Sequence, residues 1–275
     1  MRRILLCALL LAGCPSNLEE QSRVSKLRVL AVRAEPPELV LTGDGGVPAT
    51  TLTALAVIPG DAGVSVVFAL CREITSAPSP TLPCPGDAGI ELPGEGPLSA
   101  RLDLLDPRIV AFASEAQLEG GAFDAGGGIA QALDQGVPLL IGFTARAGAE
   151  RLDGFSTVTL RSDARGQADT NPPRPDLLVG DGGSIAAKEV VRLQPSAPKA
   201  DPSKKYVYSF FATAGDISSL RSTDTTATGQ SAETWVEWTA PPAPPTPPTP
   251  PTVQFWVVLR DGSGVNWVET AAPVH

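Results

Sequence analysis

The sequence predicts an all-β protein with two antiparallel β-sandwich domains. Apolar and polar residues alternate in many short runs, which is the period of half-buried strands. The 275 residues include 27 glycines and 28 prolines, and turn-forming Gly-Asp sequences separate the runs. Residues 165–175 are rich in breakers and poor in apolar side chains, so a domain boundary is expected there. The predicted domains are residues 27–163 and 164–275.

The charge of the chain excludes two classes of partner. The formal net charge is −9 at pH 7, with 30 acidic against 21 basic residues. Nucleic-acid binding requires clustered Lys and Arg side chains that neutralise phosphates. Attraction to anionic lipid by charge alone requires a similar cluster. The sequence contains no such cluster, and we therefore expect neither partner.

The first thirteen residues have the form of an export signal. Arg2 and Arg3 precede an apolar run of nine residues, 4–12. Crossing a bilayer needs roughly 20 apolar residues, so this run has the size of a signal-peptide core. The small pair Ala12-Gly13 then precedes Cys14. Residues 1–13 are predicted to be a signal peptide. The alternatives to a modified Cys14 are an ordinary secretory signal with an incidental cysteine and a buried N-terminal strand.

The stretch Leu11-Ala12-Gly13-Cys14 resembles the lipobox of bacterial lipoproteins. The resemblance implies cleavage just before Cys14, a diacylglycerol on its thiol, and further acylation with a fatty acid such as palmitate. Several acyl chains anchor a protein stably, whereas one is marginal. In that family an Asp after the cysteine prevents sorting to the outer membrane, and this chain has Pro15. The resemblance thus implies a lipid-anchored outer-membrane protein that faces either the periplasm or the outside.

Residues 14–26 follow as the lipidated cysteine and a tether. This segment is polar and shows no clean period. We expect a flexible stalk, whose twelve residues after Cys14 reach about 40 Å when fully extended.

The first domain is expected to contain seven strands. Strict alternation in the first strand places Leu27, Val29 and Ala31 on one face and the intervening residues on the other. The motif Glu35-Pro36-Pro37-Glu38 ends that strand. A helix is expected at 129–135, with Gly136 as its C-terminal cap. The remaining long connections are predicted as loops, at 75–96 and 115–128. The strands are expected at residues 26–34, 51–58, 64–71, 98–104, 108–113, 138–146 and 155–161.

Cys71 and Cys84 are the cysteines of the predicted folded region. An even pair in an exported chain favours a disulfide. Closing a loop of this length stabilises the fold by about 3 kcal/mol in the chain-entropy model. A metal pair lacks further ligands, and two free thiols are the other alternative. The predicted role of the pair is structural.

The second domain is also expected to contain seven strands. Residues 253–260 alternate so that Val253, Phe255, Val257 and Leu259 face the core. The sequence Asp261-Gly-Ser-Gly264 then forms a hairpin turn. The expected strands are 176–179, 188–193, 205–213, 217–222, 233–239, 253–260 and 265–270.

Residues 240–251 are almost wholly proline, alanine and threonine. Proline fixes φ and lacks an N–H donor, so a stiff polyproline II loop is predicted. A ligand for a groove-type partner is the alternative interpretation.

The pattern of two sandwiches resembles the immunoglobulin-like domains of predicted surface lipoproteins from high-GC Gram-negative bacteria. The similarity rests on Leu27-Arg-Val-Leu-Ala-Val-Arg-Ala-Glu-Pro-Pro37 and on Trp256-Val-Val-Leu-Arg-Asp-Gly262. It implies an immunoglobulin-like topology and assigns no catalytic residue. The Cys…Trp…Cys spacing of antibody domains is absent.

Catalytic chemistry has little support in the sequence. The one histidine, His275, is the last residue, and a frayed terminus does not position the imidazole of a triad. No zinc ligand set or nucleotide-binding fingerprint is present. The Gly-Asp turns offer one carboxylate each, whereas calcium needs six to eight converging oxygens. We therefore interpret them as turn chemistry and expect no metal and no cofactor. The aspartates concerned are Asp44, Asp61, Asp87, Asp124 and Asp181.

Three functions remain as hypotheses. The first is a non-enzymatic envelope lipoprotein that acts as an interaction or structural module, with an envelope protein as its partner. The second is a protein that binds carbohydrate or peptidoglycan through Trp235 and Trp256, which lie opposite the expected core. Packing between the domains is the alternative role for these two tryptophans. The third is a glycan hydrolase that uses two carboxylates.

Overall fold

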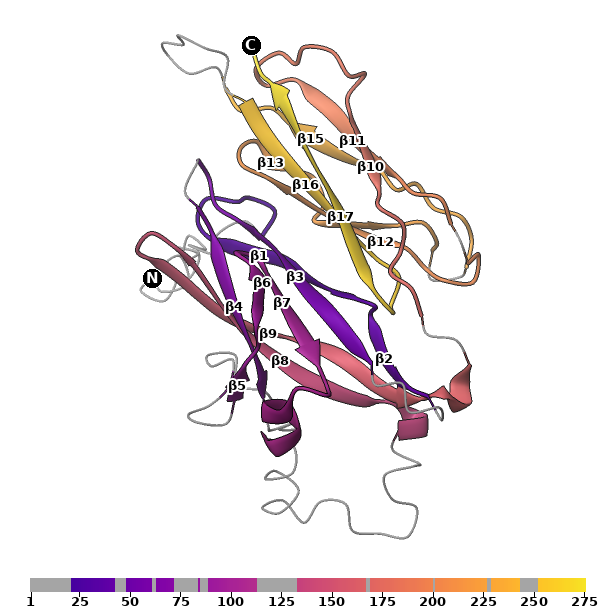
Figure 1. Cartoon of the computed structure of the whole chain (residues 1–275). Coiled ribbons are helices and arrows are strands. Elements are labelled where there is room, and N and C mark those ends of the chain that lie inside the picture. Colours follow the sequence, from indigo (N-terminus) through magenta and orange to yellow (C-terminus); the bar gives the residue numbers. More distant parts are fainter. Residues whose placement is uncertain are drawn as a thin grey trace, which may run out of the picture.

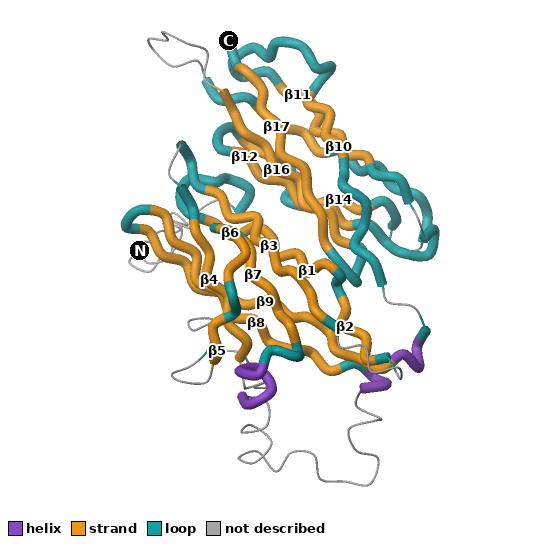
Figure 2. Tube along the Cα trace, viewed as in Figure 1, coloured by secondary structure: helices purple, strands orange, loops and turns teal. Residues whose placement is uncertain are grey.

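The computed structural model describes ten ranges of the chain. The predicted signal peptide, Cys14 and most of the proline-rich loop lie outside these ranges, as do Asp44, Asp61, Asp87 and Asp124. Within them the chain is all-β and forms two sandwiches, one following the other (Figures 1 and 2). The described residues are 21–42, 48–60, 63–71, 84, 89–112, 133–166, 169–199, 201–226, 229–242 and 252–275.

The first sandwich has sheets of strand order β1-β3-β7-β6 and β2-β9-β8-β4-β5. This order corresponds to the ABED and GFC sheets of immunoglobulin domains. The chain changes sheets between β1 and β2, so that β2 pairs in parallel with β9. The strands are β1 (Arg28–Glu35), β2 (Glu38–Leu41), β3 (Ala49–Val57), β4 (Ser65–Cys71), β5 (Gly89–Glu91), β6 (Gly94–Gly96), β7 (Ser99–Asp103), β8 (Val137–Ala147) and β9 (Glu150–Ser162).

Alternating side chains of both sheets fill the core of the first sandwich. Phe68 of β4 and Phe143 of β8 meet edge to face with ring centroids 6.5 Å apart. Gly154 of β9 lies opposite Phe143, where a Cβ would overlap the ring. The core residues of the three central strands are Leu52, Ala54, Ala56, Val66, Phe68, Leu70, Ile141, Phe143 and Ala145.

The alternation expected for the first strand is wrong beyond Val29. The register of β1 against β3 shifts between Val29 and Ala31, which is a β-bulge. Leu27 before the bulge and Val32 after it pack against the first core. Leu30 and Ala31 instead face the second domain. The period of hydrophobic residues does not reveal a bulge when both faces of a strand are apolar.

The strand expected at 108–113 is also wrong, because residues 107–112 are helical. The Asp106 carboxylate accepts a hydrogen bond from the Arg108 backbone N–H at 2.9 Å, as an N-cap residue does. Pro107 occupies the first helical position, which proline favours. The pair Asp106-Pro107 therefore indicates the start of a helix.

The long connections differ in part from the expectation. Residues 75–96, expected as a loop, contain strands β5 and β6. At the other connection, residues 133–135 are helical and end at Gly136, which has φ of +89°. Residues 115–128 lie outside the described ranges.

The second sandwich has sheets of order β10-β11-β15-β13 and β14-β12-β16-β17. A short helix, η1 (Asp163–Arg165), precedes it, so the change from one sandwich to the other falls between β9 and β10. The strands are β10 (Asp176–Val179), β11 (Val190–Ser196), β12 (Val207–Ala212), β13 (Asp216–Ile217), β14 (Arg221–Thr223), β15 (Val236–Thr239), β16 (Thr252–Arg260) and β17 (Val265–Pro273).

The core of the second sandwich is centred on Trp238. Its ring meets Phe255 edge to face at 4.8 Å between centroids, and its N–H donates to the Ala214 carbonyl at 3.0 Å. The prediction for residues 253–260 is confirmed, because all four expected side chains lie in this core. The predicted turn joins β16 to β17, with the Asp261 carboxylate accepting from the Ser263 and Gly264 N–H groups.

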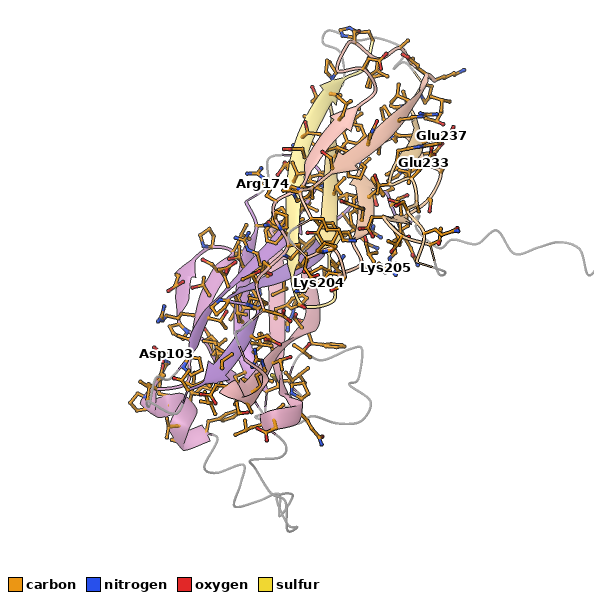
Figure 3. The ribbon with its side chains drawn as sticks, turned by 90° about the vertical axis from the view of Figure 1, so that its right-hand side faces the viewer. Asp103, Arg174, Lys204, Lys205, Glu233 and Glu237 are labelled. Atoms are coloured by element: carbon orange, nitrogen blue, oxygen red, sulfur yellow. A yellow bond between two sulfur atoms is a disulfide. The ribbon has the colours of Figure 1, made fainter. Side chains whose placement is uncertain are left out.

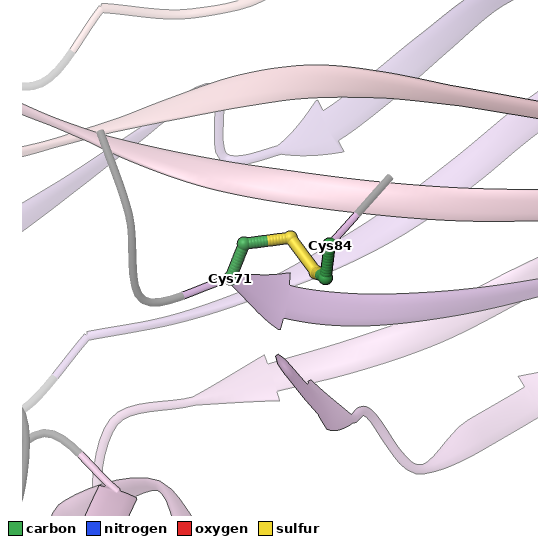
Figure 4. Close-up of a disulfide and its surroundings, with 2 residues drawn as sticks. All are labelled: Cys71 and Cys84. Carbon is green, nitrogen blue, oxygen red and sulfur yellow. A yellow bond between two sulfur atoms is a disulfide. The ribbon is translucent and has the colours of Figure 1, made fainter. Parts of the chain in front are cut away.

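A disulfide joins Cys71, at the end of β4, to Cys84 (Figure 4). The two Cα atoms are 5.4 Å apart. The Cys84 sulfur also packs against Gly89, where a Cβ would lie 2.7 Å from it. The link therefore ties the chain beyond β4 to the edge strand β5.

Removing this disulfide is expected to destabilise the first sandwich. The loop that it closes separates the two cysteines by 13 positions. The double variant Cys71→Ala and Cys84→Ala should lower the free energy of unfolding by about 3 kcal/mol, because the unfolded chain gains entropy. Urea denaturation of the oxidised protein and the double variant measures this difference. Equal unfolding free energies for the two would contradict the prediction.

Candidate functional site

The two domains are joined by a buried contact between sheets. Strand β16 is apolar on both faces: one lies in the core of the second sandwich, and the other packs on β1 and β3 of the first. Trp256 and Val258 lie on this second face and are 2% and 0% exposed. We call the contact the interdomain cluster; its buried members are Val24, Leu30, Ala31, Leu55, Val57, Trp256, Val258 and Val265.

The hypothesis that Trp256 binds carbohydrate is therefore wrong. A stacking platform must expose one face of its ring, and this ring is buried between the domains. Its indole N–H lacks a hydrogen-bond partner among the described residues. The alternative role for Trp256, packing between domains, is confirmed.

Asn171 lies in the linker, the connection between η1 and β10, and it provides polar contacts around the interdomain cluster. Its side-chain amide donates to the Ala34 carbonyl at 2.7 Å and to the Glu35 carboxylate at 2.8 Å. Its side-chain oxygen accepts from the Val265 N–H at 3.0 Å. One side chain thus bridges β1 of the first domain to β17 of the second. Gly264 is needed beside it, since a Cβ there would overlap Asn171.

Two arginines, one from each domain, add hydrogen bonds across the contact. Arg260 of β16 donates to the Leu30 carbonyl at 3.0 Å. Arg33 of β1 donates to the Asn266 side chain at 3.1 Å, and its guanidinium lies 5.0 Å from the centroid of the Trp267 ring. Cation–π and hydrogen-bond contacts of this kind fix the relative orientation of the two sheets.

The expectation of a flexible tether is wrong for residues 21–26. The Val24 N–H donates to the Ala212 carbonyl at 2.8 Å, and the Ala212 N–H donates to the Ser22 carbonyl at 3.0 Å. Val24 is fully buried, and Arg23 forms an ion pair with Asp216 at 2.7 Å. This segment, the N-terminal strap, therefore docks on the second domain before the chain enters the first. The polar composition of the segment did not predict this docking, because hydrogen bonds between backbone groups do not depend on the side-chain pattern.

A cluster of charges fixes the linker on the second domain, near Lys204 (Figure 3). The Lys204 ammonium lies 3.0 Å from the Asp169 carboxylate and 3.3 Å from that of Asp261. Burial alone would raise the pKa of Asp169, but the Ser263 hydrogen bond and Lys204 together hold that pKa below its usual value. The ion pair is therefore formed at neutral pH.

A second ion pair lies where the linker leaves the first domain. Arg161 of β9 is buried and pairs with Glu38 of β2 at 2.9 Å. The Glu38 carboxylate also accepts from the Asp169 N–H at 3.1 Å. Asp169 of the linker is thus bonded to both domains, through its N–H to Glu38 and through its carboxylate to Lys204.

Two open pockets flank the interdomain cluster. One has a volume of about 200 Å³ and lies beside Asn171 and the β16–β17 turn. The other, of about 480 Å³, lies between the N-terminal strap and both domains. The second has mainly apolar walls, and we call it the strap groove. Its lining residues are Gln21, Lys26, Leu27, Arg28, Val29, Leu30, Leu152, Phe211 and Leu220.

Trp235, the other tryptophan proposed to bind carbohydrate, is half-buried just before β15. The Arg192 guanidinium lies 4.1 Å from the centroid of its ring. One face of the ring is therefore covered by a cation. The structure does not bring Trp235 and Trp256 together, since Trp256 faces the first domain.

The remaining candidate residues fall into structural roles. Asp181 is exposed in a turn between Gly180 and Gly182, both of which have positive φ. Within the described ranges, no three His, Cys, Asp or Glu side chains come together as metal ligands. The expectation that the chain frays at His275 is wrong, since its N–H donates to Ile185 and its carbonyl accepts from Ala187.

Membrane crossing by a helix is not seen in the described part of the chain. None of the helices found there is both long enough and apolar enough to span a bilayer.

Known proteins show at most a weak similarity to this chain. No protein-family model and no curated protein matches the chain. A chimeric titin Z1Z2-Z1Z2 tandem is 10% identical over 90% of this chain and 99% of its own, with a TM-score of 0.24. An endo-fucoidan hydrolase is 13% identical over 93% of this chain and 28% of its own, with a TM-score of 0.23.

A third solved structure is a protein of unknown function from Porphyromonas gingivalis W83. It is 8% identical over 88% of this chain and 99% of its own, with a TM-score of 0.22. Similarity this weak carries no argument about function. The immunoglobulin-like description rests on the order of the strands.

Replacing Trp256 tests the interdomain cluster. Trp256→Ala should lower the free energy of unfolding by about 3–5 kcal/mol, because it leaves a cavity between the domains. Trp235→Ala is the matched control and should cost about 1 kcal/mol or less, the scale of a partly exposed cation–π contact. Urea denaturation followed by circular dichroism measures both. Equal losses for the two variants would show that Trp256 does not join the domains.

Proposed function

We propose that this protein is a lipid-anchored envelope protein that lacks enzymatic activity and acts as an interaction module at the outer membrane. The anchor is an acylated Cys14, and the module is the pair of immunoglobulin-like domains. The observation that carries the proposal is the N-terminal strap. Because residues 21–26 are docked, at most six residues separate Cys14 from the folded body, and they reach about 25 Å. Both domains are then held against the membrane surface.

The contact between the domains supports a role in which the protein presents a binding surface to a partner. A buried apolar contact, Asn171 and two arginines join one domain to the other. The sheet formed by β2, β9, β8, β4 and β5 faces away from this contact. Val67 and Phe155 are exposed on its outer face, at 45% and 43%. Both side chains flank β8, because their pairing partners Thr144 and Gly142 lie on that strand. Aromatic and aliphatic side chains exposed together favour a protein partner.

Lipidation is tested by labelling cells with radioactive palmitate. The wild-type protein should take up the label and fractionate with the outer membrane, because the acyl chains insert in lipid. Cys14→Ser should lose both properties. Cys7→Ser, in the predicted signal peptide, is the matched control and should keep both. Label retained by the Cys14→Ser protein would refute the anchor.

The interaction surface is tested by photo-crosslinking in cells. A photoreactive amino acid at position 67 should capture a protein of the envelope, because this position lies on the exposed apolar face. The same amino acid at Val190, which is 56% exposed on the second domain, is the control and should not capture it. Phe155→Asp should abolish capture at position 67. Capture that is equal at both positions, or unaffected by Phe155→Asp, would contradict the assigned surface.

A further inference from the structure

The strap groove is larger than the pocket beside Asn171, and it has three walls. Leu27, Val29 and Leu30 come from the start of β1, and Leu152 comes from β9 of the same domain. Phe211 and Leu220 come from the second domain. At about 480 Å³ the groove falls in the size range of small-molecule sites.

The groove is built by contacts that hold its walls in place. The Leu27 N–H donates to the Glu150 carboxylate at 2.7 Å, which fixes the end of the strap on the β8–β9 hairpin. The Arg28 guanidinium donates to the Gln21 carbonyl at 2.6 Å, which closes the strap back on β1. The bulge in β1 turns Leu30 toward the second domain. Leu220 of the second domain lines the groove with a half-buried side chain.

The rim of the groove has a different character from its walls. Lys26 is exposed and Arg28 is half-buried, and both carry positive charge in a chain whose net charge is −9. The carboxylate of Glu150 lies beside Leu27 and accepts a hydrogen bond from its N–H. An apolar slot with a cationic rim matches a ligand that has an apolar chain and an anionic head.

We propose that the strap groove binds one acyl chain of an anionic membrane lipid, with Arg28 at its headgroup. This inference rests on the proposed anchor, which places the groove at the membrane: Gln21 lines the groove, and seven residues from Cys14 span at most about 25 Å. The acyl groups that the lipobox resemblance implies on Cys14 carry no anionic head. The cations of the rim therefore favour a lipid of the membrane over the protein's own anchor. Burial of the chain provides the affinity, and charge selects the headgroup.

Binding is tested with the full-length Cys14→Ser protein, so that no acyl group of its own competes. The probe is lysophosphatidylglycerol, which has one acyl chain and an anionic head, used below its micelle concentration. Isothermal titration calorimetry should give one site per chain. Lysophosphatidylcholine, with the same chain and a zwitterionic head, should bind at least about tenfold more weakly. Glycerol phosphate, the head alone, should not bind. Equal affinity for the two lysolipids, or no binding of either, would overturn the proposal.

Two variants locate the site, each with a matched control. Leu220→Glu puts a carboxylate into the groove and should abolish binding, whereas Leu178→Glu, at an exposed leucine of β10, should not. Arg28→Gln keeps hydrogen-bond donors but removes the charge, so the preference for the anionic lipid should fall to near unity. Arg174→Gln, at an exposed arginine that does not line the groove (Figure 3), should leave this preference unchanged. Thermal unfolding of each variant confirms that it is folded.

The outcomes separate this inference from the proposed function. Loss of palmitate label in Cys14→Ser cells concerns the anchor, whereas calorimetry uses protein that has none. A labelled anchor with no lysolipid binding would refute the groove alone. Binding that persists in Leu220→Glu would place the lipid elsewhere and would also refute it.

Discussion

The sheet-on-sheet contact between the domains is the constraint on which the rest of the structure depends. Strand β16 is buried on both faces, as strands are when another layer covers each side of their sheet. Its inner face builds the second core around Phe255, and its outer face presents Trp256 to the first domain. Every other interdomain feature follows this contact: the bulge in β1 supplies its partner surface, Asn171 closes its edge, and the strap covers its end. Mutation of the outer face would therefore loosen the domains without dissolving either core.

The same contact decides which surfaces are left for function. It occupies the outer face of β12, β16 and β17 and that of β1 and β3. The β2-β9-β8-β4-β5 face of the first domain stays open, and so does the β10-β11-β15-β13 sheet of the second, where Leu178 and Val190 are exposed. The strap groove lies at the margin of the contact. The open face of the first domain and the strap groove have different chemistry. The sheet face offers a flat apolar area suited to a protein surface, whereas the groove is narrow, apolar within and cationic at the rim.

The sequence predicted the two sandwiches and most strands, because alternation of apolar residues reports a half-buried strand directly. In Val253–Arg260, one set of alternating side chains is enough to form a sandwich core. Trp256 and Val258 lie on the opposite face, and apolar side chains there indicate that a second layer covers the strand. The bulge at Leu30 and the docking of Val24 were beyond prediction. Each depends on backbone pairing between residues distant in sequence, as the Val24–Ala212 bond illustrates. The helix after Asp106 was predictable from its capping sequence, but the β-branched residues that follow gave the opposite signal. The proposed lipid site could not be predicted from the sequence. Leu220 and Arg28 come together only when the second domain, β9 and the start of β1 meet in the fold.

The N-terminal strap has a mechanical consequence. It is bonded to the second domain through Ser22, Val24 and the Arg23–Asp216 ion pair, and it continues directly into β1 of the first. Tension applied at the N-terminal end is therefore borne first by these bonds to the second domain. The two backbone bonds to Ala212 and the ion pair must yield before β1 alone takes the force and begins to separate from β3. The strap therefore protects the pairing of β1 with β3 from force applied at the N-terminal end.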